Sequence, residues 1–268
     1  MTITGSRKPI LELRHIECEP PGGYLPVLEQ FGPLHTVRSW EQPIPENPHD
    51  FAAIVVMGGP MGANDGATLP WIDEEIEFLR RAVVTDVAVW GVCLGAQLLA
   101  AALGAEVWTG PQPEVGVVEI SLTHAVVMDP VWAESVSSGP MHALQWHSDT
   151  FAVPGSATLI GSTAAYPSQL FRYGKSYGVQ FHLEATAELA KQWLEVSEYR
   201  TALESAIGAE AIPGFISAIA AVEASSAALA GATIGRWLNI AIDRDMQFPA
   251  VDPRATTKSP PGLNEEES

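Results

Sequence analysis

Cysteine is scarce in this sequence: among 268 residues there are two, Cys18 and Cys93. Secreted domains that depend on disulfides use cysteine much more densely, so that class is excluded. The short Cys/His spacing of a metal site is also lacking around Cys93, His147 and His182. We therefore expect neither a bound metal nor a cofactor.

Basic residues are scarce as well. The chain has 14 Lys and Arg against 32 Asp and Glu, which gives a formal net charge of −18. Such a charge opposes binding to the phosphates of nucleic acids and to anionic membrane surfaces. We expect small molecules or proteins as partners, with no nucleic acid and no membrane among them.

Residues 1–9 lack the apolar run that forms the centre of a signal peptide. Hydrophobic residues make up 47% of the chain and charged residues 17%, which is enough apolar material for a large core. At this length we expect one large domain, or one domain with an appendage. We also expect the protein to be a cytoplasmic enzyme.

Strand-like and helix-like segments alternate over the first hundred residues. Strands are predicted over 10–16, 51–57 and 87–92, and helices over 24–31, 70–81 and 94–103. This alternation is typical of parallel strands covered by helices. After Gly104 come shorter strand-like runs, at 105–108, 116–122, 143–146, 158–161, 169–173 and 177–181. Because Gly, Pro and Ser divide them, we expect an antiparallel part attached to the same sheet.

The segment 88–100 carries the strongest chemical signal. An apolar strand leads into Gly91-Val92-Cys93-Leu94-Gly95, and a run rich in Ala and Leu follows. Glycines on both sides of the turn allow close backbone approach, so the pattern predicts a nucleophile elbow. Cys93 would then lie at a helix N-terminus, where the helix dipole favours the thiolate. The alternative is a buried structural cysteine, and Cys18, without flanking glycines, is not expected to be catalytic.

A second glycine-rich turn, Gly58-Gly59-Pro60-Met61-Gly62, ends the strand predicted at 51–57. The N–H groups of such a turn bind a phosphate or stabilise an oxyanion. The alternative is a tight turn without a chemical role.

Two histidines stand out in the second half of the chain, His147 within 145–150 and His182 within 178–184. We expect His182 to end a strand, which places Glu184, two residues later, on the same side. A carboxylate in this position orients an imidazole, and the imidazole takes the proton of a cysteine. The sequence therefore predicts that Cys93, His182 and Glu184 act together.

Five segments, in this order, resemble the class I glutamine amidotransferase family: 58–60, 91–97, 114–116, 146–149 and 180–184. The similarity is greatest to stand-alone members that resemble the glutaminase domain of GMP synthetase, and it covers roughly residues 10–195. It implies a flavodoxin-like three-layer α/β fold with a central, mostly parallel sheet. It also implies a Cys-His-Glu triad that hydrolyses the γ-carboxamide of glutamine through a γ-glutamyl thioester.

The resemblance assigns a role to each matching residue. Cys93 is the nucleophile, His182 the general base and then acid, and Glu184 the orienting carboxylate. The N–H groups of Gly59 and Leu94 match the oxyanion-hole donors of the family. The positions that hold the α-amino and α-carboxylate groups of the substrate correspond to Met61, Gln97, Gly116, Val117 and Asp149.

Four positions depart from the family pattern. The usual His-Pro-Glu is His182-Leu183-Glu184 here, Val117 replaces a usual Trp, Ala96 a frequent His, and Ser148 a frequent Gly. Because the triad is intact, we expect the chemistry to persist. A strict preference for glutamine is what the changes put in doubt.

The C-terminal part lies beyond the resemblance. Residues 186–203 and 212–242 are predicted to be helical, with a break at Pro213-Gly214. Glu223 and Arg236 interrupt the second segment as a membrane span. We divide the chain into a catalytic domain at 8–195, a helical extension at 196–247 that acts as a cap or dimer element, and a disordered tail at 248–268.

Three functions are open at this point. The first is hydrolysis of a γ-glutamyl amide, with ammonia or a larger amine leaving. The second is a glutaminase subunit that delivers ammonia to a separate synthetase or ligase. The third is a non-catalytic regulatory scaffold, against which the intact triad argues. We also expect a homodimer formed through the C-terminal helices.

Overall fold

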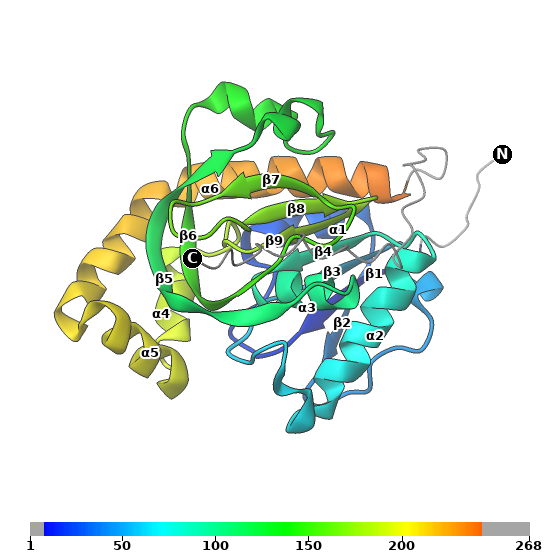
Figure 1. Ribbon diagram of the computed structural model, residues 1–268, viewed down its shortest axis with the longest axis horizontal. Helices are drawn as coiled ribbons and strands as arrows, with labels where there is room; N and C mark the ends of the chain where they lie inside the picture. The colour runs from blue at the N-terminus through cyan, green and yellow to red at the C-terminus, as the bar shows by residue number, and fades with distance from the viewer. Residues whose placement is uncertain (1–7, 243–268) are drawn as a thin grey trace, which may run out of the picture.

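A nine-stranded sheet organises the chain, in the order β2-β1-β3-β4-β9-β8-β7-β5-β6 (Figure 1). The computed structural model describes residues 8–242. The parallel part consists of β2 (Leu34–Arg38), β1 (Ile10–Arg14), β3 (Ala53–Val56), β4 (Val89–Val92) and β9 (Ser176–Val179). The antiparallel part consists of β8 (Leu170–Tyr173), β7 (Thr158–Ser162), β5 (Val107–Leu122) and β6 (Met141–Phe151). The predicted fold class is confirmed, and the sheet is mixed rather than mostly parallel.

Helices cover both faces of the parallel strands, which explains why β3 (Ala53–Val56) and β4 (Val89–Val92) are short apolar runs without alternation. The strands β3 and β4 are buried at every residue. On one face lie α2 (Pro70–Val84) and α3 (Leu94–Ala102), and on the other lie α1 (Leu25–Phe31) and α6 (Ile212–Ile242) (Figure 1). The result is a three-layer arrangement with an apolar core on each side of the sheet.

The helix α6 belongs to the main core. Its residues Ala230, Ile234, Trp237 and Leu238 are fully buried with residues of the central strands. The ring of Trp237 lies 5.5 Å, centroid to centroid, from that of Trp90 on β4. The last described helix therefore completes the face of the sheet that α1 covers only in part.

The helices α4 (Ala187–Trp193) and α5 (Ser197–Ile207) project from the end of the sheet at which β5 and β6 lie (Figure 1). With the start of α6 they enclose a third apolar cluster, in which Trp146 of β6 contacts Trp193 and Phe215 at centroid distances of 5.5 and 5.1 Å. Aromatic pairs of this edge-on kind bind the helices firmly to the sheet.

Several boundaries differ from the sequence-based expectation. The strand β2 was not expected, and 105–108 and 116–122 are parts of one strand, β5, with a register shift between Thr109 and Glu114. The expected break at Pro213-Gly214 is wrong, because the chain turns earlier and α6 begins at Ile212. A proline in the first turn of a helix loses no hydrogen bond, so Pro213 starts α6 instead of interrupting it.

By length and composition, the helical segment 209–242 is able to cross a membrane. In the structure its two interior charges make contacts within the protein. Glu223 accepts a hydrogen bond from the N–H of Ala187 at 2.9 Å, and Arg236 donates to the carbonyl of Val131 at 3.1 Å.

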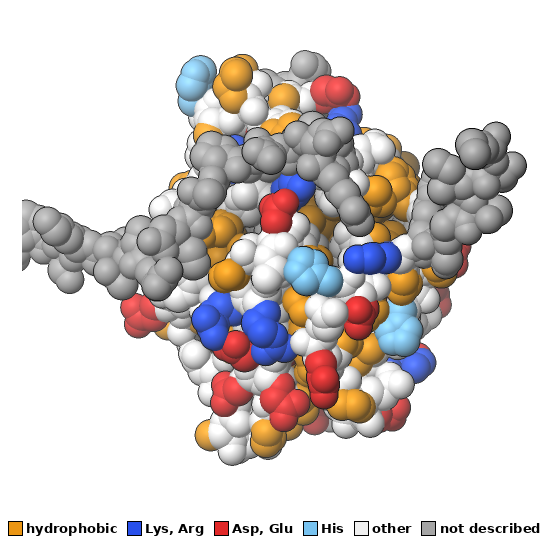
Figure 2. Space-filling view, turned by 90° about the vertical axis from the view of Figure 1, so that its right-hand side faces the viewer, with side chains coloured by type: hydrophobic (Ala, Val, Ile, Leu, Met, Phe, Trp, Pro, Cys, Tyr) orange, Lys and Arg blue, Asp and Glu red, His pale blue; other side chains and the backbone are white. Residues whose placement is uncertain are grey.

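On the face shown in Figure 2, basic and acidic side chains are interspersed. The predicted tail at 248–268 lies outside the described residues.

Candidate active site

Cys93 lies in the turn between β4 and α3, with φ 51° and ψ −109°. A positive φ is strained for a residue with a Cβ, and strain of this kind concentrates at functional sites. The N–H of Cys93 donates to the carbonyl of Val179 on β9 at 2.8 Å, and the N–H of Gly95 donates to the carbonyl of Met57 at 3.2 Å. The predicted elbow is thus present, and the neighbouring strands hold it.

His182 and Glu184 lie side by side after β9. The Nδ1–H of His182 donates to Oε1 of Glu184 at 2.6 Å, and both side chains are buried. The expectation that His182 ends a strand is wrong, because β9 stops at Val179. Instead, the N–H of His182 donates to the carbonyl of Leu144 at 2.9 Å in an isolated bridge to β6. The two-residue spacing still places both side chains on one side.

The surroundings of His182 favour its cation. Burial lowers the pKa of this imidazole, but the charges of Glu184 and Cys93 and the hydrogen bonds to both outweigh burial, so the pKa lies well above its ordinary value. The ring of Trp193 meets the imidazole edge-on, 5.0 Å between centroids. An imidazolium is therefore the charge state of His182 that suits this site.

Two glutamines form a hydrogen-bonded series from Cys93 to the backbone of β6. The side-chain amide of Gln180 donates to Sγ of Cys93 at 3.5 Å. Gln97, in the first turn of α3, donates at 3.2 Å to Oε1 of Gln180 and at 3.2 Å to the carbonyl of Asp149. Gln180 lies in one of the five motifs but was assigned no role there. Its position two residues before His182 is the signal that places it on the same side.

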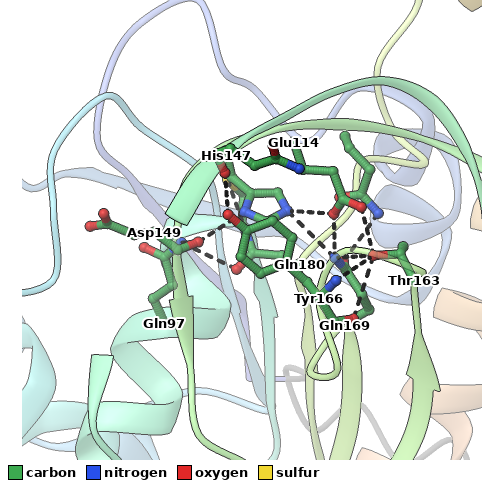
Figure 3. Close-up of polar contacts among 11 residues, drawn as sticks. Gln97, Glu114, His147, Asp149, Thr163, Tyr166, Gln169 and Gln180 are labelled. Carbon is green, nitrogen blue, oxygen red and sulfur yellow. Dashed lines mark hydrogen bonds and ion pairs between the residues drawn. The ribbon is translucent and has the colours of Figure 1, made fainter. Parts of the chain in front are cut away.

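A buried polar network adjoins the backbone of Asp149 (Figure 3). Glu114 accepts from Gln169 and Thr163, at 2.6 Å in both cases, and lies 3.1 Å from Nε2 of His147. The other ring nitrogen of His147 donates to the carbonyl of Asp149 at 2.9 Å. The network ties the bulged part of β5 to β6 and fixes the backbone that carries Asp149. His147 therefore helps to hold the backbone around the site in place.

The turn at 58–62 lies directly beside the elbow. A Cβ on Gly59 would stand 3.2 Å from the side chain of Leu94, so these two residues are neighbours. His15 fixes the turn by donating to the carbonyl of Gly58 at 3.1 Å, and its other nitrogen lies 3.0 Å from Glu75. The N–H of Leu94 opens α3 and has no acceptor within that helix. The geometry brings the two predicted oxyanion-hole residues together.

A cavity of about 530 Å³ opens over Cys93. Its walls come from the turn at 59–62, from β5 and β6, and from α5. The lining residues are Gly59, Pro60, Met61, Gly62, Cys93, Gln97, Pro113, Val115, Trp146, His147, Ser148, Asp149, Glu198, Tyr199, Ala202, Ser205 and Ala206. Among these described residues, Asp149 and Glu198 are acidic and none is Lys or Arg. Within residues 8–242, no three His, Cys, Asp or Glu side chains are placed to hold a metal ion.

The predicted substrate-binding residues divide into two groups. Met61, Gln97 and Asp149 line the cavity, whereas Gly116 and Val117 do not, and Val115 takes their place. Because Gly116 has φ +127°, the strand β5 is locally irregular there, and alternation along a regular strand does not apply. Sequence reasoning also missed Glu198 and Tyr199, which lie on α5 outside the five motifs.

Comparison with known proteins gives consistent results. The family model described as glutamine amidotransferase class-I matches residues 27–197. The chain is 32% identical over 197 residues to the glutamine amidotransferase-like protein YfeJ of Salmonella typhimurium, covering 70% of this chain and 80% of that protein. It is 28% identical over 159 residues to one subunit of the glutamine-hydrolysing GMP synthase of Ignicoccus hospitalis, covering 59% of this chain and 79% of that protein.

Solved structures extend the similarity beyond the sequence motifs. A glutamine amidotransferase of Methylobacillus flagellatus superposes with a TM-score of 0.77 at 27% identity, covering 92% of this chain and 100% of that one. A glutamine amidotransferase of Thermotoga maritima gives a TM-score of 0.74 at 25% identity, covering 87% of this chain and 99% of that one. The shared part therefore includes much of the C-terminal helical region.

Proposed function

The chain belongs to the glutamine amidotransferase class-I family, and from this premise we propose that it hydrolyses γ-glutamyl amides with Cys93 as nucleophile. The observation that carries the proposal is that His182 lies close to Cys93 and is hydrogen-bonded to Glu184, beneath an open cavity. A nucleophile, a base and a group that orients the base are the parts that acyl transfer requires.

In the first half of the reaction, the thiolate of Cys93 attacks the γ-carbonyl carbon of the substrate. The negative charge that develops on the carbonyl oxygen is stabilised by the N–H groups of Gly59 and Leu94. The C–N bond then breaks, and the imidazolium of His182 gives its proton to the leaving nitrogen. A γ-glutamyl thioester remains on Cys93, and ammonia or an amine departs.

In the second half, water takes the position of the departed amine. Neutral His182 removes a proton from the water, whose oxygen attacks the thioester carbon at the same oxyanion site. Collapse of the tetrahedral intermediate breaks the C–S bond and releases glutamate. Glu184 stabilises the imidazolium that forms in each half.

The shape of the cavity favours a leaving group larger than ammonia. Three of the five residues that α5 contributes to the wall, Ala202, Ser205 and Ala206, have small side chains, which leaves space over Cys93 beside Glu198 and Tyr199. In this assignment Asp149 holds the α-ammonium group of the γ-glutamyl part. Val117, where the family usually has Trp, does not line the cavity, so this position does not restrict the site.

A glutaminase subunit is the second candidate. It is favoured by the match to one subunit of a GMP synthase, most of whose length the chain covers. In this case the leaving group is ammonia, and a separate synthetase partner receives it. The two candidates share the chemistry at Cys93 and differ in the leaving group and in the need for a partner.

The test is to incubate the purified protein with glutamine and with a panel of γ-glutamyl amides, and to measure released ammonia and amine. Hydrolysis of substituted amides in preference to glutamine supports the first candidate. Efficient turnover of free glutamine without a partner counts against it. Cys93→Ala is expected to be inactive on each substrate, with Cys18→Ser as the matched control. Activity of Cys93→Ala equal to that of the parent on every substrate overturns the triad, and absence of activity in the parent favours the regulatory scaffold.

Two further proposals concern the C-terminal helices, which the sequence predicted to be a cap or dimer element. We propose that α6 is a core helix of a cytoplasmic protein, because Trp237 and Leu238 are buried against the sheet. Recovery of the protein in the soluble fraction without detergent tests this proposal. The homodimer stays a prediction, and light scattering of the purified protein checks it.

A further inference from the structure

A second buried carboxylate, Glu19, lies against His182. It follows β1 in the chain and is 3% exposed. A Cβ on Gly58 would stand 3.3 Å from the carboxyl carbon of Glu19 and 3.4 Å from Cε1 of His182, so the two side chains converge on the bare face of this glycine. Glu184 accepts from Nδ1 of His182, whereas Glu19 lies near Cε1 of the same ring. None of the five sequence motifs contains it.

The carboxylate of Glu19 is held from the C-terminal region. The hydroxyl of Tyr199 on α5 donates to Oε1 of Glu19. Tyr199 also lines the cavity over Cys93, and its ring lies 6.2 Å from that of Trp193, which packs on His182. Tyr199 of α5 is thus connected to the imidazole in two ways. Its ring lies near that of Trp193, which contacts His182, and its hydroxyl donates to Glu19.

Several ionisable groups face Glu19 from the elements around it. They are His182 and Glu184 after β9, His15 after β1, Tyr199 on α5 and the adjacent Cys18. Burial raises the pKa of Glu19 most, the charge of His182 lowers it, Glu184 raises it and His15 lowers it, with a result of about 7. Glu19 therefore changes its charge near pH 7.

We propose that Glu19 and Tyr199 are positioning residues for the catalytic imidazole: Glu19 supplies a second carboxylate to the His182 cation, and Tyr199 fixes that carboxylate from α5. This inference rests on the proposed function of Cys93 and His182. The helix α5 is then part of the active site, because its residue Tyr199 acts through Glu19 on the imidazole that transfers the proton.

The ionised form of Glu19 stabilises the imidazolium and accepts the Tyr199 hydroxyl. Activity should therefore rise as the pH passes through the pKa of Glu19. In Glu19→Gln the side chain keeps its size and stays neutral, so that rise should disappear. In Tyr199→Phe the ionised carboxylate loses a hydrogen bond, so the rise should move to higher pH.

The experiment measures two pH profiles on the full chain. One is kcat and KM for hydrolysis of a γ-glutamyl amide. The other is the rate of alkylation of Cys93 by iodoacetamide, read from the Cys93 peptide by mass spectrometry, which needs no substrate. We expect a step near pH 7 in the parent, its absence in Glu19→Gln, its upward shift in Tyr199→Phe, and a loss of kcat of about tenfold in each variant.

Two matched controls separate positioning from structural support. Glu17→Gln makes the same change two residues away on an exposed ion pair with Arg38. Tyr177→Phe removes a hydroxyl that donates to the carboxylate of Asp129 at 3.1 Å. Both should keep the parent profiles. The double variant of Glu19 and Tyr199 should be no worse than Glu19→Gln alone.

Parent-like profiles in Glu19→Gln and Tyr199→Phe overturn the inference. If Glu19→Gln does not fold, as judged by thermal unfolding, Tyr199→Phe alone decides, because it removes a single oxygen atom. If the parent hydrolyses no γ-glutamyl amide, the proposed function fails, and the alkylation profile still decides the role of Glu19.

Discussion

Gly91 and Gly95 lie against each other across the turn that carries Cys93. A Cβ on residue 91 would stand 2.6 Å from the carbonyl carbon of Gly95, and a Cβ on residue 95 would stand 2.8 Å from the carbonyl carbon of Val56 on β3. Backbone atoms cannot move aside as a flexible side chain can. The approach of β3, β4 and α3 at this point therefore requires glycine at both positions.

Gly91→Ala is expected to lower the free energy of unfolding by about 1–3 kcal/mol, because the added methyl group forces strand and helix apart. The same displacement should slow alkylation of Cys93. Urea unfolding and the alkylation rate measure the two effects. Gly214→Ala is the control: no atom lies within 4 Å of its Cβ position in α6, so its stability should be unchanged or higher.

Glu184→Gln is expected to reduce kcat by about 10²–10⁴-fold with a small change in KM. The amide oxygen still accepts from Nδ1 of His182, but the charge that stabilises the imidazolium is gone. Steady-state kinetics check this prediction. Glu188→Gln makes the same change on the exposed side of α4 and should behave as the parent does. Parent-like kinetics in Glu184→Gln would refute its proposed role.

Asp149→Asn is expected to raise KM for γ-glutamyl substrates by about 10–100-fold, because the α-ammonium group loses its charged partner. The hydrogen bond from Thr109 to Oδ1 at 2.7 Å can be kept by the amide oxygen, so the local fold should persist. A change in kcat with an unaltered KM would argue against substrate binding. The exposed Asp50→Asn is the matched control.

Protonation of Glu19 makes stability depend on pH in a direction opposite to that of an ordinary paired carboxylate. Its pKa rises from 4.5 in the unfolded chain to about 7 in the folded protein, so the folded state holds the proton more tightly. The contribution of Glu19 to stability is fully present below pH 4.5 and is lost as the pH rises through about 7.

Glu19→Gln should abolish this loss. Relative to the parent, the variant should gain stability between pH 4.5 and 7, by about 1.4 kcal/mol for each unit of pKa shift. Chemical unfolding of both proteins at a series of pH values measures the difference. A difference that does not change with pH would contradict the raised pKa.

Trp237→Ala is expected to lower the free energy of unfolding by about 3–5 kcal/mol. The side chain is fully buried, and its Nε1–H donates to the carbonyl of Lys175 at 2.9 Å. Trp108→Ala removes an exposed indole, 39% accessible, and should cost much less. Equal losses in the two variants would show that α6 does not complete the core.

Local patterns predicted most of the fold correctly. Glycines around Cys93 marked the elbow, and uninterrupted apolar runs marked β3 and β4, because their causes lie within a few residues of sequence. The strand β2 escaped because its sequence, Leu34-His35-Thr36-Val37-Arg38, alternates weakly and gains stability mainly by pairing with β1. Edge strands of this kind are specified by partners far away in the sequence.

The candidate site shows the same limit. The two-residue spacing of His182 and Glu184 was sufficient to predict their contact, and the structure brings His182 close to Cys93. The contact of Glu19 with Tyr199 joins residues 180 positions apart, and neither lies in a recognisable motif. Long-range contacts of this kind depend on how helices pack, and no periodicity in the sequence reports them.

The burial of Trp237 on Trp90 has a consequence for the order of events during synthesis. Trp90 lies three residues before Cys93, yet one of its packing partners is made almost 150 residues later. A ribosome releases the elbow strand long before the helix that covers it. The apolar side of β4 that faces α6 is therefore uncovered when the strand leaves the ribosome. It becomes covered only when α6 packs against it. Full assembly of the site is thereby postponed until nearly the whole described chain has been made.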